Sequence, residues 1–77
     1  MLLKRLKDLR EDNDWTQRHI ADLLHISRSA YSAYENGANA PSIEALVNIS
    51  KLYNTSVDYI IGLTDERQPY KRASKGR

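Results

Sequence analysis

The amino-acid sequence predicts an all-α fold, a compact bundle of five short helices. Apolar residues recur at intervals of three and four through residues 2–62, which is the period of an amphipathic helix. Residues that favour helix N-caps, such as Thr16, Ser27 and Ser42, stand directly before these periodic stretches. No segment shows the strict alternation of apolar and polar residues that is typical of a half-buried strand.

The first predicted helix covers residues 2–12. Leu2, Leu6 and Leu9 fall on one side of it, and charged residues fill the other side. The sequence of residues 12–14, Asp-Asn-Asp, has the composition of a turn and ends this helix.

Residues 16–37 read as two short helices joined by a tight turn. Thr16 is a suitable N-cap for the first of them and Ser27 for the second. Gly37 is suited to end the second helix in the left-handed conformation. So short a connection forces the two helices to cross steeply, which is the helix-turn-helix geometry. In that geometry the second helix can enter a DNA major groove.

Two further helices complete the predicted bundle. Ser42 can cap a helix over residues 43–53, and Asn54 tolerates the left-handed conformation after it. Ser56 begins a fifth short helix, which Gly62 ends.

We therefore predict a folded domain over residues 1–64 and a basic, disordered tail over residues 65–77. Residues 1–65 carry seven Lys and Arg against nine Asp and Glu, a net charge of −2, whereas residues 66–77 carry five against one, a net charge of +4. Because the folded part is not basic, any DNA binding must depend on the local placement of charge and on the tail. The tail either adds sequence-independent DNA affinity or only aids solubility.

Composition argues against several other classes. The chain has no cysteine, and its longest apolar runs fall far short of a membrane span, which takes about 20 residues. Charges interrupt the N-terminal segment where a signal peptide needs an apolar core, so we expect a cytoplasmic protein. His19, Asp22 and His25 lack further ligands, so no metal site is expected. We expect neither a cofactor nor enzyme activity, because no nucleophile motif or glycine-rich phosphate loop is present.

Several motifs, taken with their joint spacing, resemble the Cro/cI-type phage-repressor (XRE) helix-turn-helix family over residues 3–62. These motifs are Leu6-x-x-Leu9-Arg10, Trp15-Thr16-Gln17-x-x-x-Ala21-x-x-Leu24, Ile26-Ser27-x-x-x-Tyr31-Ser32-x-Tyr34-Glu35-x-Gly37, Pro41-Ser42-x-x-x-Leu46 and Val57-Asp58. The resemblance implies a lambda-repressor-like five-helix domain that usually acts as a homodimer on palindromic operators.

The resemblance also implies roles for single residues. Gln17 matches the residue that anchors its helix on a phosphate and buttresses the recognition helix, and Asn36 matches a phosphate contact. Arg10 and Glu35 match a structural salt bridge. The groove-facing positions of the recognition helix are Arg28, Ser29, Ser32 and Ala33. Arg18 and Asn39 are expected to add phosphate contacts. The expected DNA-binding residues are therefore Gln17, Arg18, Arg28, Ser29, Ser32, Ala33, Asn36 and Asn39.

Three positions depart from the family pattern. His25 stands at the turn position usually held by glycine, where a left-handed residue is expected, and His is among the residues that tolerate it. Tyr31 replaces an aliphatic core residue, so the core must be reshaped around a ring. The loop at residues 38–40 lacks the basic residue that relatives often carry, so phosphate contacts there would come from backbone amides or Asn39.

Two functions remain open from the sequence. The first is a transcriptional regulator, a repressor, that binds double-stranded DNA as a homodimer. Arg28 would read guanine, and Tyr59, Ile60 and Leu63, with Tyr70, would form the dimer interface. The second is a protein-interaction module, an antitoxin or adaptor, whose main partner is another protein and whose DNA binding is weak.

Overall fold

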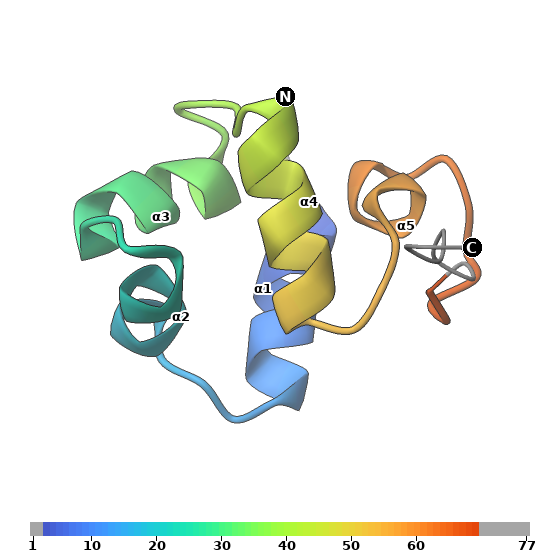
Figure 1. The fold of residues 1–77 in the computed structure, drawn as a ribbon, viewed down its shortest axis with the longest axis horizontal. Helices are drawn as coiled ribbons and strands as arrows, with labels where there is room; N and C mark the ends of the chain where they lie inside the picture. The colour runs from blue at the N-terminus through green and yellow to red at the C-terminus, as the bar shows by residue number, and fades with distance from the viewer. Residues whose placement is uncertain (1–2, 70–77) are drawn as a thin grey trace, which may run out of the picture.

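The computed structural model describes residues 3–69 of the chain. Five helices and no strand occur among these residues, so the predicted all-α class is confirmed (Figure 1). The helices are α1 (Lys4–Asp12), α2 (Gln17–Leu24), α3 (Arg28–Asn36), α4 (Ile43–Leu52) and α5 (Val57–Ile61).

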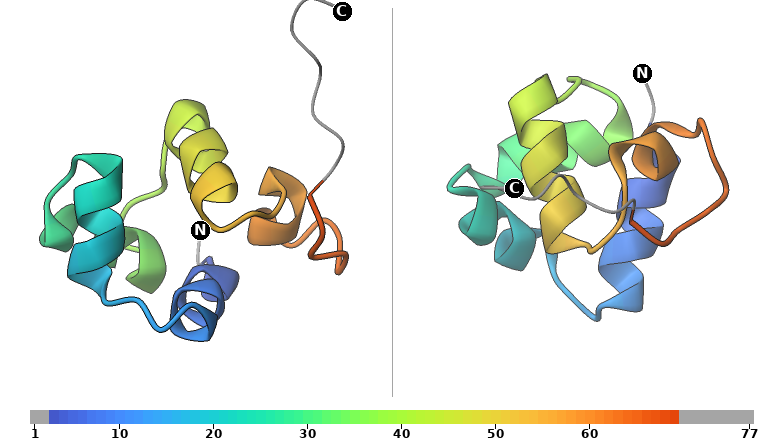
Figure 2. Two further views of the ribbon diagram at one scale, coloured as in Figure 1. Left: turned by 60° about the horizontal axis from the view of Figure 1, so that its bottom comes forward. Right: turned by 45° about the vertical axis from the view of Figure 1, so that its right-hand side comes forward.

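The helices form three groups along the long axis of the molecule. Figures 1 and 2 show α2 and α3 together at one end, α1 and α4 in the middle, and α5 at the opposite end. The pair α2–α3 is the predicted helix-turn-helix, and its outer side lies far from α5.

Local capping explains where most helices begin. Four helices start after a Ser or Thr whose hydroxyl accepts a hydrogen bond from the amide three residues later, as the sequence predicts. The four capping residues are Thr16, Ser27, Ser42 and Ser56. The first helix is the exception. It begins at Lys4, and the preceding residue, Leu3, cannot form a side-chain cap. The predicted start at residue 2 lies outside the described residues.

Left-handed residues end the helices that need a sharp change of direction. Gly37 and Gly62 adopt φ values of 84° and 88° after α3 and α5. His25 takes φ 60° and ψ 40° in the turn between α2 and α3, which confirms the conformation expected at this position. Asn54 is also left-handed, with φ 54°.

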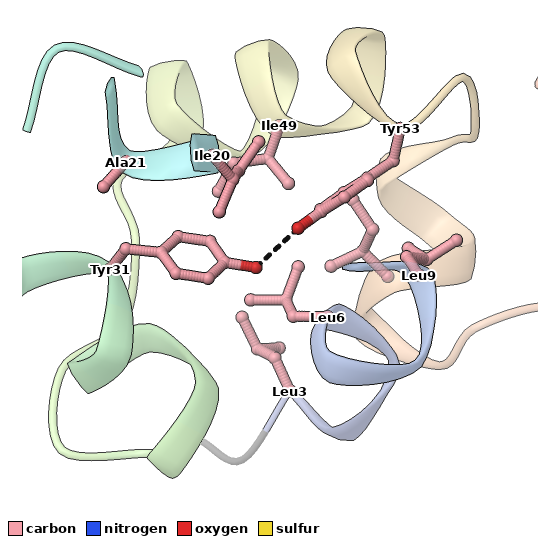
Figure 3. Close-up of a cluster of buried hydrophobic side chains, with 9 residues drawn as sticks. Leu3, Leu6, Leu9, Ile20, Ala21, Tyr31, Ile49 and Tyr53 are labelled. Atoms are coloured by element: carbon pink, nitrogen blue, oxygen red, sulfur yellow. Dashed lines mark hydrogen bonds between the residues drawn. The ribbon is translucent and has the colours of Figure 1, made fainter. Parts of the chain in front are cut away.

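The hydrophobic core lies between the helices, and all five helices contribute side chains to it. Its buried members are Leu3, Leu6, Leu9, Ile20, Ala21, Tyr31, Ile49, Tyr53 and Ile60. Figure 3 shows that Tyr31 and Tyr53 point toward one another across this cluster. Their hydroxyl oxygens are 2.7 Å apart. The core thus accommodates the Tyr31 ring, as expected, and the Tyr31 hydroxyl is paired with the Tyr53 hydroxyl at the centre of this apolar cluster.

One predicted interface residue belongs to the core instead. Ile60 is only 2% exposed, because α5 is a single short helix whose inward side must cover α1. Leu63 lies just beyond α5 and is 73% exposed. Tyr59 is half-buried, with the Arg5 guanidinium 4.2 Å from the centre of its ring. The prediction of Ile60 as a dimer contact is wrong, and Tyr70 lies outside the described residues.

The segment that follows α5 lies against the body as far as it is described. Arg5 donates hydrogen bonds to the carbonyl of Thr64 and to the carboxylate of Asp65. Arg67 forms an ion pair with Asp12 at 2.7 Å. The Thr55 hydroxyl also donates to the carbonyl of Arg67 at 2.6 Å. The tail predicted from residue 65 therefore has contacts over residues 65–69 that composition did not indicate, and residues 70–77 lie outside the described part.

Candidate nucleic-acid interface

The N-terminal end of α3 lies beside the N-terminal end of α2 on the outer side of the molecule. Arg28 and Ser29, in the first turn of α3, are exposed. Ser32 and Ala33, one turn further on, are half-buried. The exposed side of α3 is thus formed mostly by small polar residues with one long cation at its start, a surface that can approach base edges closely.

Gln17 connects the two helices at this end. Its Nε2 donates to Oε1 of Glu35 at 3.1 Å, and its Oε1 accepts a hydrogen bond from Nη1 of Arg28 at 3.2 Å. The side chain of Gln17 therefore lies between the largely buried carboxylate of Glu35 and the exposed guanidinium of Arg28. These two hydrogen bonds connect Gln17 of α2 to α3, which is the supporting contact with the recognition helix that the resemblance implies.

Arg10 and Glu35 form the ion pair that the resemblance implies. Nε of Arg10 donates to one carboxylate oxygen of Glu35 at 2.7 Å, and Nη2 donates to the other at 3.2 Å. The two side chains are only 14% and 7% exposed. Arg10 also donates to the carbonyl of Trp15 at 3.1 Å. This bidentate pair fixes α3 to α1 and to the segment that leads into α2.

Hydrogen bonding at this pair governs the protonation of both partners. Burial by itself would raise the pKa of the Glu35 carboxyl. The hydrogen bonds that the carboxylate accepts, chiefly from Arg10 and Gln17, outweigh burial and hold the pKa of Glu35 below its ordinary value. The hydrogen bond to Glu35 likewise raises the pKa of Arg10. Both groups are therefore charged at neutral pH.

The starts of α2 and α3 expose backbone amides on the same side. Thr16 and Ser27 each cap only the third amide of the helix that follows. The first two amides of each helix have no intrahelical acceptor. Arg18 is exposed in the first turn of α2. This combination of free amides, positive helix dipoles and a nearby cation favours phosphate groups.

The two remaining predicted residues lie at and beyond the end of α3. The Asn36 side chain is exposed, and its Oδ1 accepts a hydrogen bond from the amide of Ala38 at 2.9 Å. The Asn39 amide donates to the carbonyl of Ala33 at 3.2 Å, and its side chain is exposed. These contacts shape the loop after α3, and both side chains face solvent.

The polar interior beneath the interface was not foreseen. Sequence reasoning placed Tyr31 in the core but did not identify Tyr53 as its partner. Burial, followed by the hydrogen bond to Tyr53, raises the pKa of Tyr31, and burial raises the pKa of Tyr53 to about 12. Both hydroxyls therefore stay protonated and able to donate. The sequence did offer one signal of this pair. Tyr53 stands at the end of the helix predicted over residues 43–53, where an aliphatic residue would be enough to fill the core.

Two negative observations concern the described residues only. No group of three or more His, Cys, Asp or Glu side chains within residues 3–69 is arranged to hold a metal ion. None of the five helices combines the length and apolar character of a membrane-spanning segment.

Comparison with known proteins agrees with this geometry. The family model described as "Helix-turn-helix" matches residues 6–60. The HTH-type transcriptional regulator AnsR of Bacillus subtilis is 38% identical over 73 residues, which cover 95% of this chain and 63% of that protein. The uncharacterized HTH-type transcriptional regulator YobD of the same organism is 39% identical over 90% of this chain and 62% of its own length.

A relative of a different description also matches. Antitoxin PezA of Streptococcus pneumoniae is 39% identical over 80% of this chain and 39% of that protein. No solved structure matches significantly. The matched part of the chain covers 63% of AnsR and 62% of YobD, which is less than two thirds of either protein. The matched family model and the arrangement of α2 and α3 show that this chain belongs to the XRE-type helix-turn-helix family.

Proposed function

We propose that this chain is the DNA-binding domain of a transcriptional repressor that acts in the cytoplasm on a palindromic operator. The observation that carries the proposal is the position of Arg28. It is exposed at the first residue of α3 and is held there by Gln17. A guanidinium in that place can donate two hydrogen bonds to O6 and N7 of one guanine, a contact worth about 1–3 kcal/mol of discrimination.

The other groove-facing residues add contacts of lower specificity. The hydroxyls of Ser29 and Ser32 can donate to or accept from several bases, and the methyl group of Ala33 can contact a thymine methyl. Phosphate contacts are suited to Gln17 and Arg18 of α2, to Asn36 at the end of α3 and to Asn39 in the loop after it, together with the free amides of α2 and α3. These contacts would position the helix, while Arg28 would specify the sequence.

A homodimer would present two copies of α3 to two half-sites about 34–36 Å apart. Leu63, which is 73% exposed, and the half-buried Tyr59 are two residues available for a self-complementary contact beside α5. Leu63→Glu should lower the dimer fraction measured by sedimentation equilibrium without reducing the helix content. An unchanged dimer fraction would place the interface elsewhere.

The direct test is selection of bound duplexes from a random library with the wild type and with Arg28→Ala. The wild type should enrich a palindrome, and the variant should lose preference at one symmetric pair of positions. Lys7→Ala is the matched control, because Lys7 is an exposed cation on α1 and its removal changes the net charge equally. The control should retain the wild-type preference at every position.

Two results would contradict the proposal. Selection of no enriched sequence by the wild type at moderate salt would argue against sequence-specific recognition. Enrichment of the same sequence by the wild type and Arg28→Ala would retain DNA binding but remove Arg28 from base recognition.

A second candidate function is a protein-interaction module. Residues 3–69 carry eight Lys and Arg against ten Asp and Glu, a net charge of −2, which does not favour DNA over a large surface. A matched relative is described as an antitoxin. Tight binding to a partner protein, together with no enriched duplex, would favour this function over the regulator.

A further inference from the structure

The α5 end of the molecule presents an exposed apolar side chain on a backbone that is held in place. Leu63 is 73% exposed. Its amide donates to the carbonyl of Asp58 at 2.8 Å, directly after the left-handed turn at Gly62. On its other side, the carbonyl of Thr64 accepts a hydrogen bond from Arg5. Because the backbone of Leu63 is fixed on both sides, little disorder remains to be lost when a partner covers its side chain.

Arg5 fastens this end of the chain to α1. Its guanidinium donates to the carbonyl of Tyr59 at 2.8 Å and lies 4.2 Å from the centre of the Tyr59 ring. It also forms an ion pair with Asp65. The last carbonyls of a helix lack intrahelical partners, and a cation at that end suits the helix dipole. A helix as short as α5 is not stable by itself, so its end depends on such contacts from α1.

A hollow lies between the start of α1 and the end of α5, beside the residue that precedes Leu63. It has a volume of about 200 Å³ and is lined by Lys4, Arg5, Ile60, Ile61 and Gly62. A Cβ atom placed on Gly62 would meet no atom of residues 3–69 within 4 Å, apart from its neighbours in the chain. Cavities of about 150 Å³ hold a molecule the size of benzene, so this hollow has room for a leucine side chain.

The charges beside Leu63 and beside the hollow are of opposite sign. Lys4 is an exposed cation at the hollow. Asp65 and Glu66 follow Leu63 closely and are exposed, and the Asp65 side chain remains 98% exposed although it pairs with Arg5. A leucine that entered the hollow of a second copy would bring these carboxylates toward Lys4 of that copy. The chain thus carries both halves of one contact, as a self-complementary two-fold interface requires.

We propose that Leu63 of one copy enters the hollow beside Gly62 of a second copy, and that Arg5 positions both parts of this contact. In a two-fold dimer the contact occurs twice, since each copy supplies one leucine and one hollow. Arg5 forms a wall of the hollow and also holds the carbonyl that follows Leu63. This contact deepens the proposed function and rests on it, because it would form the homodimer suggested there.

The first test is crosslinking between two differently substituted copies. The chain has no cysteine, so each variant carries a single reactive thiol. A copy with Leu63→Cys is mixed with a copy with Lys4→Cys, a short bismaleimide is added, and the mixed adduct is identified by mass. Ile43→Cys is the matched control for Leu63→Cys, because Ile43 is 80% exposed and lies in the first turn of α4. The Leu63–Lys4 adduct should accumulate as the protein concentration passes through the range of dimer formation, and the Ile43–Lys4 adduct should not.

Two outcomes of this test would overturn the proposal. The first is a protein that is dimeric by sedimentation equilibrium but gives no Leu63–Lys4 adduct, or equal amounts of both adducts. The interface would then lie elsewhere, and the proposed DNA-binding function would stand. The second is a wild type that remains monomeric at every concentration, which would remove the homodimer as well. The selection of duplexes would still decide whether the domain recognises DNA.

The second test concerns Arg5 and follows the dissociation constant of the dimer by sedimentation equilibrium. Arg5→Lys keeps the charge but lacks the planar fork that reaches several acceptors at once. It should raise the dissociation constant about five- to a hundredfold, as expected when two leucine side chains per dimer must be ordered on binding. Lys7→Arg is the control, because it also keeps the charge at an exposed position of α1, and it should leave the constant unchanged.

Circular dichroism at the same temperature would establish that each variant is folded, so that lost stability is not counted as lost association. If Arg5→Lys does not fold, Asp65→Asn provides the comparison, because it removes one partner of the guanidinium at an exposed position. An unchanged dissociation constant in the folded variant would overturn the role of Arg5.

Discussion

Replacing Glu35 by alanine should destabilise the domain far more than breaking any exposed ion pair of the chain. Glu35 accepts hydrogen bonds from Arg10 at 2.7 and 3.2 Å and from Gln17 at 3.1 Å. Its side chain is 7% exposed, so water cannot replace these contacts without rearrangement. The substitution would leave the Arg10 guanidinium, which is 14% exposed, without its counter-charge.

The magnitude follows from the uncompensated charge. Removing one partner of a buried ion pair costs about 3–5 kcal/mol. A domain of this size has a total free energy of unfolding of about 4–12 kcal/mol. Glu35→Ala should therefore remove a large part of the stability. Arg10→Met with Glu35→Leu removes both charges and should be less destabilised than Glu35→Ala alone, because no buried charge is left unpaired.

Urea denaturation followed by circular dichroism would measure these differences. Asp12→Ala is the control, since it breaks the Arg67–Asp12 pair, whose side chains are 45% and 55% exposed. That control should lose less than about 1 kcal/mol. The reasoning would be refuted if Glu35→Ala lost no more stability than Asp12→Ala.

Three other predictions concern pH and backbone conformation. The pKa of Glu35 lies below its ordinary value of 4.5, so the stability from its ionised form should be lost as pH falls below 4.5, and Glu35→Gln should flatten this part of the pH–stability curve. Because the pKa values of Tyr31 and Tyr53 are raised, the stability that their protonated hydroxyls contribute should be complete below pH 10 and should be lost as pH rises above it. Ultraviolet absorbance should show two tyrosines that ionise only near or beyond pH 12 or on unfolding. His25→Gly should raise the melting temperature, since a non-glycine residue at φ 60° is strained by about 1 kcal/mol. Asn54→Gly should gain less, because Asn tolerates this conformation, and equal gains would contradict the explanation.

Local signals in the sequence were sufficient to predict most of the fold. Thr16 and Ser27 cap their helices through amides only three residues away. The left-handed conformation of Gly37 was likewise expected from a glycine directly after a periodic stretch, whereas that of His25 was expected from the family resemblance. Such features depend on interactions within one helical turn, which spacing along the chain reveals directly.

The candidate site was predictable to a smaller extent. The Arg10–Glu35 pair was expected only from the family resemblance, since the two residues are 25 apart in the chain. The partner of Tyr31 was not identified, because Tyr53 follows it by 22 residues and nothing local relates them. Ile60 was misassigned for a similar reason. The apolar residues of a five-residue helix suit either a core or an interface, and only the packing of α5 on α1 decides between them.

The separation of α2–α3 from α5 has a consequence for how the domain opens and closes. The α2–α3 unit is joined by a very short turn, so its contacts form without closing a long loop. The contacts between α1 and α5 instead join residues far apart, as in the hydrogen bond from Arg5 to the carbonyl of Tyr59, 54 positions later. We expect the α5 end to assemble last and to open first, and hydrogen exchange to be faster there. Transient opening at that end would leave the proposed DNA-reading helices paired.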